Sequence, residues 1–556
     1  MESALSTGKK TLHYRRPSER PFLAEERDKV TILIGGLTRK HEEFIRAVFQ
    51  GSGHKCELLP VPDQESFLLG KEFGNNGQCS PAYFTSGALI QYLRALEAEG
   101  MSRRDIVDHY LYFTAGSCGP CRFGMYAAEY RHALNNAGYD GFRVVRFQQD
   151  DGIRQKTTFP GLKYTIDFGL GMLKVLYLGD ALNDLAHNIR AYEVNPGETN
   201  RAMDACVREI CEHLREYKSP DLADRFPRLY SAARLGERKF LRGLLSFLYK
   251  MREHLRGKEF MEVMERCRKR IDGIAVDRLR LRPVVKIVGE FWAQTTEGGG
   301  NYQMFDFLEK EGAQVQPEAI GTWINYLLAH ARMQMYPRRG LDADCREPAR
   351  RDLRRRWRNE LSFQKKRAML VFGEKLYTGL YHHVIKSLGG TAHTLVPQDQ
   401  LAGLANPFYK PLARGGEGYL EVGKNIYYHK HTLCHMVLSL KPFGCLPSSQ
   451  SDGIQSAVTS KFRDMIFLPI ETSGEGETNA HSRVQMALGE AKLKAKAEFQ
   501  DALSSTGKKI EDIRAYVDRR PELRRPLYRV PHRPGIAGVA ANFVLHVNDL
   551  MEGRTA

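Results

Sequence analysis

Residues 29–38, KVTILIGGLT, form a short apolar run that ends in two glycines. The residues after it, HEEFIRAVFQGSG at 41–53, have the spacing of an amphipathic helix that is ended by glycine, and CELLPVP at 56–62 is a second apolar run. Apolar strands that alternate with helices of about 10–15 residues are typical of a parallel sheet covered by helices. The sequence therefore predicts an α/β fold from residue 28 onward.

The same alternation continues to residue 148 and returns at PVVKIVGEF, residues 283–291, while the chain between repeats its apolar residues at helical spacing. Further helices are expected near 371–388 and near 429–440. The predicted organisation is an N-terminal arm (1–27), a first α/β domain (28–154), a helical region (155–282), a second α/β domain with a basic insertion at 330–370 (283–475) and a C-terminal helical segment (476–556).

The composition of the 556 residues is that of a globular protein with a net charge of +17, which favours anionic partners. No apolar run approaches the roughly 20 residues that span a bilayer, and the N-terminus has no apolar core of a secretory signal. We therefore expect a cytoplasmic protein without a membrane partner. In that reducing compartment, the ten cysteines stay available for metal or redox chemistry.

The basic insertion holds thirteen Lys or Arg and five Asp or Glu between residues 332 and 367. Such a run is usually a solvated helix face. It is also compatible with an acidic protein, with the phosphates of coenzyme A or with nucleic acid. No zinc-finger or RNA-recognition pattern accompanies it, so nucleic acid is the least favoured partner.

Four loops attract attention because ligands gather at the carboxyl ends of parallel strands, where we expect these loops to lie. They are residues 74–81, 114–124, 443–453 and 471–477, and three of them carry cysteine between Gly and Pro. Gly lets backbone N–H groups approach an anion, and an iron–sulfur cluster needs thiolates on iron and N–H donors on sulfur. The candidate metal ligands are Cys79, Cys118, Cys121 and Cys445.

Simpler interpretations stand beside this one. Isolated cysteines are mostly buried small hydrophobes, which is the interpretation for Cys56, Cys206, Cys211, Cys267 and Cys345. The Cys118–Cys121 pair alone also matches a thioredoxin-like redox pair or half of a zinc site. The run HKHTLCH at 429–435 is more readily a helix face than a metal site.

The loop EFWAQTTEGGGN at 290–301 follows a strand and precedes a helix. A helix N-terminus there would bind a phosphate or carboxylate, and a plain turn explains the sequence equally well. The loop is not a Walker A motif, and the chain has no sequence basis for ATP hydrolysis.

Taken together, these segments resemble the 2-hydroxyacyl-CoA dehydratase component proteins, specifically the acyl-CoA dehydratase activase-related branch. The resemblance extends from about residue 28 to 495. The segments that carry it are TILIGGLT (31–38), FGNNGQCSPAYFTSGALIQYL (73–93), TAGSCGPCRFGMYAAEYRHALNNAGYDGFRVVRFQQ (114–149), GDALNDLAHNIRAYEVNPGET (179–199), PVVKIVGEFWAQTTEGGGNYQMF (283–305), KPFGCLPSSQSDGIQSAV (441–458) and IETSGEGETNAHSRVQM (470–486).

The resemblance implies two flavodoxin-like, doubly wound parallel-sheet domains with helical insertions and a 4Fe–4S cluster between them. By motif order, Cys79, the Cys118/Cys121 pair and Cys445 supply its three thiolates, and either or both of the paired cysteines ligate; related double-cubane proteins hold a larger cluster. The residues expected to line the site are Ser448, Ser449 and Glu471 on the catalytic side, Gln78, Thr114, Thr296 and Gly298 on the cofactor side, and Asp452 and Glu477.

The family chemistry removes a 2-hydroxyl from an acyl-CoA thioester after a low-potential electron has reduced the thioester carbonyl to a ketyl radical anion. That electron comes from an ATP-hydrolysing iron–sulfur activator, which would be a separate partner here, alongside a related dehydratase subunit. The implied function is thus a lyase or low-potential reductase with coenzyme A thioesters as substrates. The alternative is a non-catalytic iron–sulfur electron-transfer or scaffold subunit, and a cluster-free nucleic-acid-binding protein is a third hypothesis.

Overall fold

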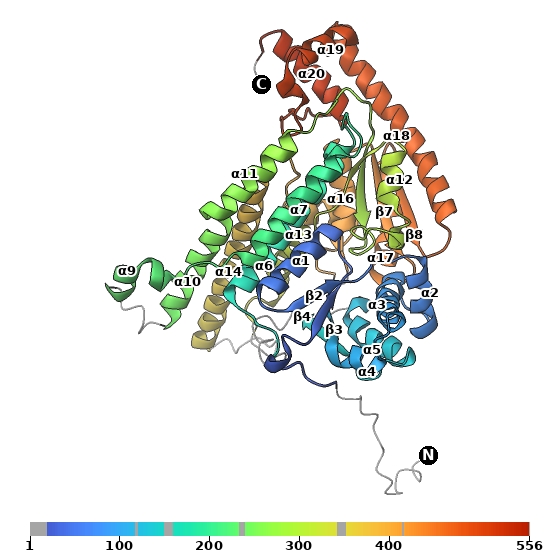
Figure 1. Ribbon diagram of the computed structural model, residues 1–556. Coiled ribbons are helices and arrows are strands. Elements are labelled where there is room, and N and C mark those ends of the chain that lie inside the picture. The colour runs from blue at the N-terminus through green and yellow to red at the C-terminus, as the bar shows by residue number, and fades with distance from the viewer. Residues whose placement is uncertain are drawn as a thin grey trace, which may run out of the picture.

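The chain folds around two four-stranded, all-parallel sheets, each flanked by helices (Figure 1). The computed structural model describes residues 19–116, 121–148, 160–232, 239–341, 352–413 and 416–554. The first sheet has the order β2-β1-β3-β4 and the second the order β6-β5-β7-β8. The strands are β1 (Thr31–Ile34), β2 (Lys55–Leu58), β3 (Tyr110–Gly116), β4 (Arg143–Gln148), β5 (Val284–Gly289), β6 (Gln314–Gln316), β7 (Met436–Pro442) and β8 (Phe467–Thr472).

Three of the four central strands are buried along their whole length, which is why they appear in the sequence as largely apolar runs. Every residue of β1, β5 and β7 is buried. Strands covered by helices on both faces lose the polar alternation of half-exposed strands. The predicted α/β class with two doubly wound parallel sheets is confirmed.

Five helices accompany the first sheet, and polar side chains cap three of them. Thr38, Asp63 and Ser102 accept the free N–H groups of the first turns of α1, α2 and α4. The helices are α1 (Arg39–Gly51), α2 (Gln64–Phe73), α3 (Ser80–Ala98), α4 (Arg103–His109) and α5 (Tyr126–Asn136).

The region between the sheets is helical among its described residues, and α6 connects it to both domains. One face of α6 packs on α1 of the first domain, while another lies against β6 of the second. Asp180 on α6 also caps α13, because its carboxylate accepts the N–H groups of Ile320 and Gly321 at 2.7 Å each. The helices here are α6 (Ile166–Arg190), α7 (Glu198–Glu216), α8 (Leu222–Arg225), α9 (Pro227–Ala232), α10 (Lys239–Arg256) and α11 (Lys258–Asp272).

The second sheet repeats the connectivity of the first. In both domains a pair of packed helices, α2 and α3 or α15 and α16, precedes the third strand. The helices of this half are α12 (Met304–Lys310), α13 (Ile320–Met333), α14 (Leu353–Ser387), α15 (Gln398–Ala405), α16 (Tyr419–Lys430) and α17 (Leu446–Lys461), followed by α18 (Glu477–Thr506), α19 (Ile510–Asp518) and α20 (Val539–Met551). Short 3-10 turns are η1 (Ala24–Glu26), η2 (Arg122–Met125), η4 (Gly299–Asn301), η5 (Tyr336–Arg338) and η6 (Pro521–Arg524).

Two of the expected helices differ from the structure. The helix predicted near 429–440 is wrong: α16 ends at Lys430 and residues 436–442 form the central strand β7. A short apolar run such as MVLSLKP has no period that separates a buried strand from a buried helix. The helix expected near 371–388 begins earlier, at Leu353, so it includes part of the basic insertion.

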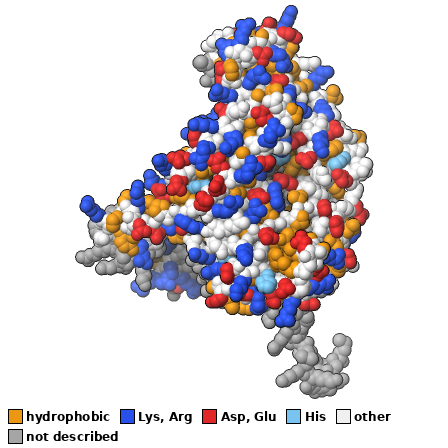
Figure 2. Space-filling model, viewed as in Figure 1, with side chains coloured by type: hydrophobic (Ala, Val, Ile, Leu, Met, Phe, Trp, Pro, Cys, Tyr) orange, Lys and Arg blue, Asp and Glu red, His pale blue; other side chains and the backbone are white. Residues whose placement is uncertain are grey.

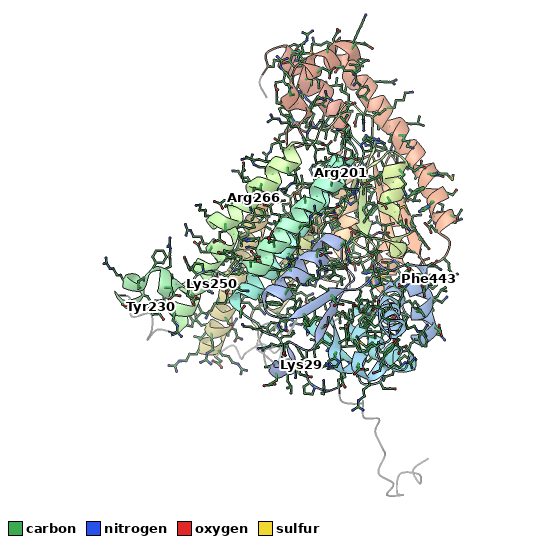
Figure 3. The ribbon with its side chains drawn as sticks, viewed as in Figure 1. Lys29, Arg201, Tyr230, Lys250, Arg266 and Phe443 are labelled. Atoms are coloured by element: carbon green, nitrogen blue, oxygen red, sulfur yellow. The ribbon has the colours of Figure 1, made fainter. Side chains whose placement is uncertain are left out.

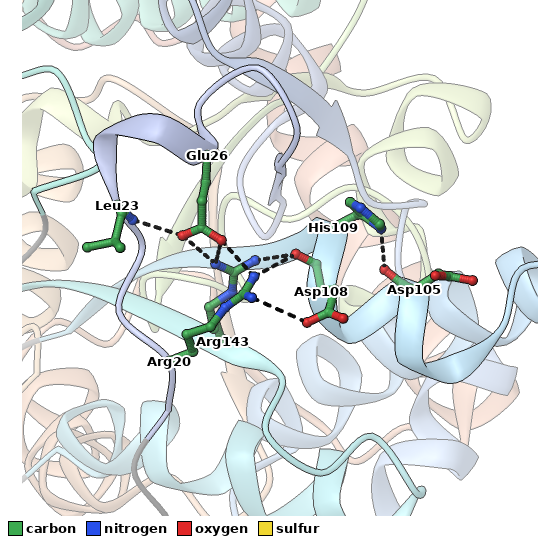
Figure 4. A network of polar contacts seen from close by, with 7 residues as sticks. All are labelled: Arg20, Leu23, Glu26, Asp105, Asp108, His109 and Arg143. Carbon is green, nitrogen blue, oxygen red and sulfur yellow. Dashed lines mark hydrogen bonds and ion pairs between the residues drawn. The ribbon is translucent and has the colours of Figure 1, made fainter.

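Residues 19–27, assigned to the N-terminal arm, pack onto the first domain. Figure 4 shows the polar network that fixes them: Glu26 lies 2.6 Å from Arg20 and 3.3 Å from the buried Arg143 of β4. Arg143 also donates to the carbonyl of Asp108 at 2.6 Å. Arg143 is buried, so water does not solvate its guanidinium group. The carboxylate of Glu26 compensates that positive charge instead.

The crossing of α2 and α3 depends on glycine. A Cβ on Gly87 would lie 1.6 Å from the carbonyl oxygen of Ser66, and a Cβ on Gly70 would lie 1.9 Å from that of Tyr83. The two backbones therefore touch where no side chain fits. This contact sets the position of the α3 N-terminus.

We expect Gly87→Ala to destabilise the first domain by about 1–3 kcal/mol, because the added methyl group must push the two helices apart. A thermal melt followed by circular dichroism measures this. The matched control is Gly489→Ala on the exposed side of α18, where a Cβ meets nothing within 4 Å and the helix gains about 0.5–1 kcal/mol. Equal melting temperatures for the two variants would show that the α2–α3 contact is loose.

None of the described helices combines the length and the apolar character needed to cross a membrane.

Candidate metal centre

The three candidate cysteines that the structure describes all occupy the same kind of position, the N-cap of a helix. Cys79 precedes α3, Cys121 precedes η2 and Cys445 precedes α17. In α3 and α17 a proline follows in the first turn, at Pro81 and Pro447. A helix N-terminus presents free N–H groups and a positive dipole end, both of which stabilise a thiolate.

The loops reach these positions in two ways. Cys121 comes after β3 and Cys445 after β7, at the carboxyl ends of equivalent strands in the two sheets. The loop of Cys79 follows no strand: it lies after α2 and leads into α3. The crossing of α2 and α3 thus brings Cys79 to this end of the molecule.

The Cys79 and Cys445 loops, from opposite domains, touch directly. The N–H of Ser80 donates to the carbonyl of Phe443 at 3.2 Å, and the Ser80 hydroxyl donates to the carbonyl of Thr472 at 2.8 Å. Gly444 has φ +74°, and a Cβ there would lie 3.3 Å from the carbonyl oxygen of Gln78. Figure 3 labels Phe443 at this junction of the domains.

The Cys121 turn joins the same cluster of loops through two side chains. Tyr126, at the start of α5, lies with its hydroxyl 2.8 Å from the Cys79 sulfur. Arg122 donates a hydrogen bond to the carbonyl of Gly77 in the Cys79 loop. These contacts bring residues of all three described loops to one place.

Burial raises the pKa of each of these thiols, to about 12 for Cys121. The carboxylate of Glu290 raises the pKa of all three further, and that of Glu417 raises the pKa of Cys121 and Cys445. The N–H groups of Ala82, Phe123 and Ser448 act in the opposite direction, each on the cysteine of its own helix. The N–H donors stabilise cysteines in the thiolate form. Burial and the nearby carboxylates oppose this form, so a bound cation is required to keep the cysteines ionised.

Glu290 and Glu417 are site residues that sequence reasoning did not select. Glu290 follows β5 directly and accepts the N–H of Ala293 at 2.9 Å, while Glu417 precedes α16 and accepts the N–H of Phe291 at 2.6 Å. Burial raises the pKa of both carboxyls, and for Glu417 the charge of Glu290 adds to it. In the repeated connectivity Glu417 holds the place of Cys79, because each lies just ahead of the second helix of the packed pair. The signal in the sequence was the Gly416-Glu417-Gly418 run.

The residues predicted to line the catalytic side separate into two groups. Ser448 is buried next to Cys445, and its hydroxyl has no hydrogen-bond partner among the described residues. Ser449 is exposed and donates to the Cys445 carbonyl at 2.9 Å. Glu471 is also exposed, because it alternates with the buried Thr472 along the edge strand β8. Of the other two residues, Asp452 pairs with Lys441, and Glu477 lies 3.9 Å from His481 on α18.

The residues predicted on the cofactor side occupy different environments. Gln78 lies beside Cys79, and its N–H donates to the Tyr83 hydroxyl at 3.0 Å. Thr114 is a buried residue of β3. Thr296 and Gly298 belong to the loop after β5, which packs on the first domain: the N–H of Gly299 donates to the carbonyl of Pro62 at 2.9 Å. Thr296 and Gly298 thus belong to an interdomain contact.

Among the described residues, no three His, Cys, Asp or Glu side chains come together closely enough to hold a metal ion. Cys118 lies outside the described residues. What fits a cluster is the chemistry of the donor set: three buried or half-buried thiols, each at a helix N-terminus with an N–H group nearby.

The remaining cysteines and the histidine run bear no such features. Cys56, Cys206, Cys211 and Cys267 are buried as expected, and Cys345 is outside the described residues. In the run 429–435, His435 accepts the N–H of Val284 at 2.9 Å through Nδ1 and so supports the sheet.

No protein-family model matches the chain, and no curated protein matches its sequence at a significant level, so the likeness to dehydratase components remains a prediction from the sequence.

Proposed function

We propose that this chain is an iron–sulfur protein in which Cys79, Cys121 and Cys445, together with Cys118, hold a 4Fe–4S cluster between the two α/β domains. One observation supports this above the others. Two cysteine N-caps from opposite domains meet through the hydrogen bond from Ser80 to Phe443, and the third cysteine lies on a turn that bonds to the same loop.

The proposed reaction is one-electron chemistry on an acyl-CoA or a similar substrate, with an ATP-hydrolysing iron–sulfur activator as partner. When bound, a low-potential cluster supplies single electrons that ordinary side chains cannot. The chain's own groups hold the cysteines in place. Ala82, Phe123 and Ser448 direct N–H groups toward the cysteines. Pro81 and Pro447 stiffen the first turns of α3 and α17. The net charge of +17 favours the phosphates of coenzyme A.

Purification without oxygen tests the proposal. The protein should be brown, with broad visible absorbance and about four iron and four sulfide per chain, as one 4Fe–4S cluster requires. A colourless protein that takes up neither iron nor sulfide after anaerobic reconstitution would reject it.

A second candidate, a non-catalytic electron-transfer subunit, is favoured by exposed apolar side chains next to the cysteines. Phe443 and Leu446 flank Cys445, and Met125 ends the turn that Cys121 begins. Large exposed apolar residues mark surfaces that other proteins cover. Turnover of acyl-CoA thioesters in the presence of an activator and ATP separates the two functions, since only the enzyme consumes the thioester.

Tyr126→Phe is expected to keep iron while moving the reduction potential to a more negative value. The Tyr126 hydroxyl lies 2.8 Å from the Cys79 sulfur and would donate a hydrogen bond to a bound thiolate. Hydrogen bonds to cluster thiolates stabilise the reduced, more negative state. A redox titration followed by EPR measures the shift. Tyr139→Phe is the matched control, because Tyr139 is buried in the same domain and its hydroxyl has no partner among the described residues. Identical potentials in both variants would remove Tyr126 from the site.

A further inference from the structure

The two halves of the 35-residue helix α14 differ in how deeply their side chains are buried. Its C-terminal half packs into the helical core through residues such as Tyr377, Tyr381 and Val384. The N-terminal half, residues 353–372, has one buried side chain, Phe363, which contacts Tyr336. This half lies away from α3 and α17, on the other side of the molecule from the cysteine loops (Figure 1).

That half exposes five large apolar side chains on its solvent side. At 3.6 residues per turn, Leu353, Trp357 and Leu361 follow each other at i+4. Phe372 lies on the same side, about 100° around the helix from Leu353, and Met369 lies about 60° further around, still on the exposed half. Their exposed fractions are 72%, 69%, 53%, 63% and 62%. Single exposed apolar residues are ordinary, but a row that extends over about 29 Å of helix, at 1.5 Å per residue, marks an interaction surface.

Uncompensated positive charges share this side. Arg354, Arg358 and Lys365 lie between the apolar residues, and Glu360, the acidic residue of this half, already pairs with Arg339 at 2.8 Å. Within the described residues these three cations have no ion-pair partner. Figure 2 shows Lys and Arg side chains gathered around the free end of α14. We call these eight residues, the five apolar and the three basic, the α14 stripe.

We propose that the α14 stripe is a docking surface for an acidic amphipathic helix of another protein. Apolar residues at i and i+4 accept the apolar face of such a helix, and carboxylates on its flanks meet Arg354, Arg358 and Lys365. A second copy of this chain does not fit, because each copy carries +17 and presents the same basic stripe.

The residue types favour a protein over the other anionic partners. Trp, Arg and Met are enriched at the centres of protein interfaces, and the α14 stripe contains Trp357, Met369 and two arginines. Nucleic acid would stack on the aromatic residues and leave Leu353 and Leu361 in water. A helix that lies in a membrane surface carries its basic residues on the face opposite to the apolar one, whereas Arg354, Arg358 and Lys365 lie among the apolar residues here.

Calorimetric titration of the full chain with a designed peptide tests the proposal. The probe is a 21-residue helix with Leu at i, i+3, i+4 and i+7 and Glu elsewhere, and its counterpart carries Lys in place of Glu. The Glu peptide should bind, its affinity should fall as salt rises, and the blue shift of Trp357 fluorescence should follow it. The Lys peptide should not bind.

The variants locate the binding surface. Arg354→Glu/Arg358→Glu and Trp357→Ser should each weaken the Glu peptide at least tenfold. Arg356→Glu/Lys366→Glu, a matched charge reversal on the other side of the same helix, should change its affinity less than twofold. Circular dichroism checks that all variants fold.

Three results would overturn the proposal: no binding of the Glu peptide, equal weakening by both charge reversals, or saturation by phosphatidylserine vesicles or duplex DNA where the peptide fails. The last would assign the stripe to a membrane surface or to nucleic acid. Because the stripe is remote from the cysteines, peptide binding should be the same in protein with and without iron, so its failure is distinct from failure of the proposed function.

Discussion

Cys79→Ala and Cys445→Ala are each expected to reduce the bound iron from about four atoms per chain to fewer than one, with loss of the visible absorbance. Each substitution removes one of the thiolates that we propose to hold the cluster. The two residues belong to different domains, so either loss leaves the cluster without support from one side. Iron and sulfide assays on protein purified without oxygen measure the result.

Cys267→Ala is the matched control. Its thiol is fully buried in the helical core, where the Cys206 sulfur contacts its carbonyl, and it has no contact with the loops of the candidate centre. This variant should retain its iron. Equal iron in Cys79→Ala, Cys445→Ala and Cys267→Ala would refute the ligand assignment and the proposed electron chemistry together.

The fold could be predicted from the sequence wherever burial imposes a recognisable pattern. The runs at 31–34 and 284–289 lie in central strands covered on both faces, so they are mostly apolar, and glycine follows or ends each one. The run at 436–442 is just as buried, but it follows a helix after only five residues and without a glycine or proline between them. The local sequence therefore does not distinguish this strand from a continuation of the helix. The distinction comes from the tertiary structure, in which β7 pairs between β5 and β8.

The candidate centre was predictable in its residue types but not in its geometry. Cysteine between Gly and Pro identified Cys79 and Cys445, yet their meeting depends on the tertiary contact between Ser80 and Phe443. Glu417 was missed because its role arises from the repeated connectivity of the two domains, which a single sequence does not reveal. Glu471 was overvalued, since its position in the alternation of β8 directs it to solvent.

Glu318→Gln is expected to destabilise the second domain by about 3–5 kcal/mol, because it leaves two buried ammonium groups without their counter-charge. The Glu318 carboxylate lies 3.0 Å from the Lys286 Nζ and 3.1 Å from the Lys424 Nζ, and both lysines are buried. Lys286 also donates to the carbonyl of Pro317 at 2.9 Å, so it cannot turn away to water. A denaturant titration followed by circular dichroism measures the loss.

The pH dependence of stability provides a second signature of the same group. Burial alone would raise the pKa of Glu318, but Lys286 and then Lys424 outweigh it and hold the pKa at about 2. A carboxyl with a lowered pKa in the folded state contributes stability above its unfolded value of about 4.3, and loses it as the pH falls toward 2. The parent protein should therefore lose stability across this interval, and Glu318→Gln should show a flatter profile there.

Two further variants decide whether the buried charges cause the effect. Glu262→Gln removes an exposed partner of Lys258 and should cost less than about 1 kcal/mol, as surface pairs do. Glu318→Gln/Lys424→Met removes one of the two unpaired ammonium groups, so it should recover part of the stability that Glu318→Gln loses. If the double variant is instead the less stable one, then shape and packing around Lys424 matter more than its charge, and the buried lysines are compensated by groups other than Glu318.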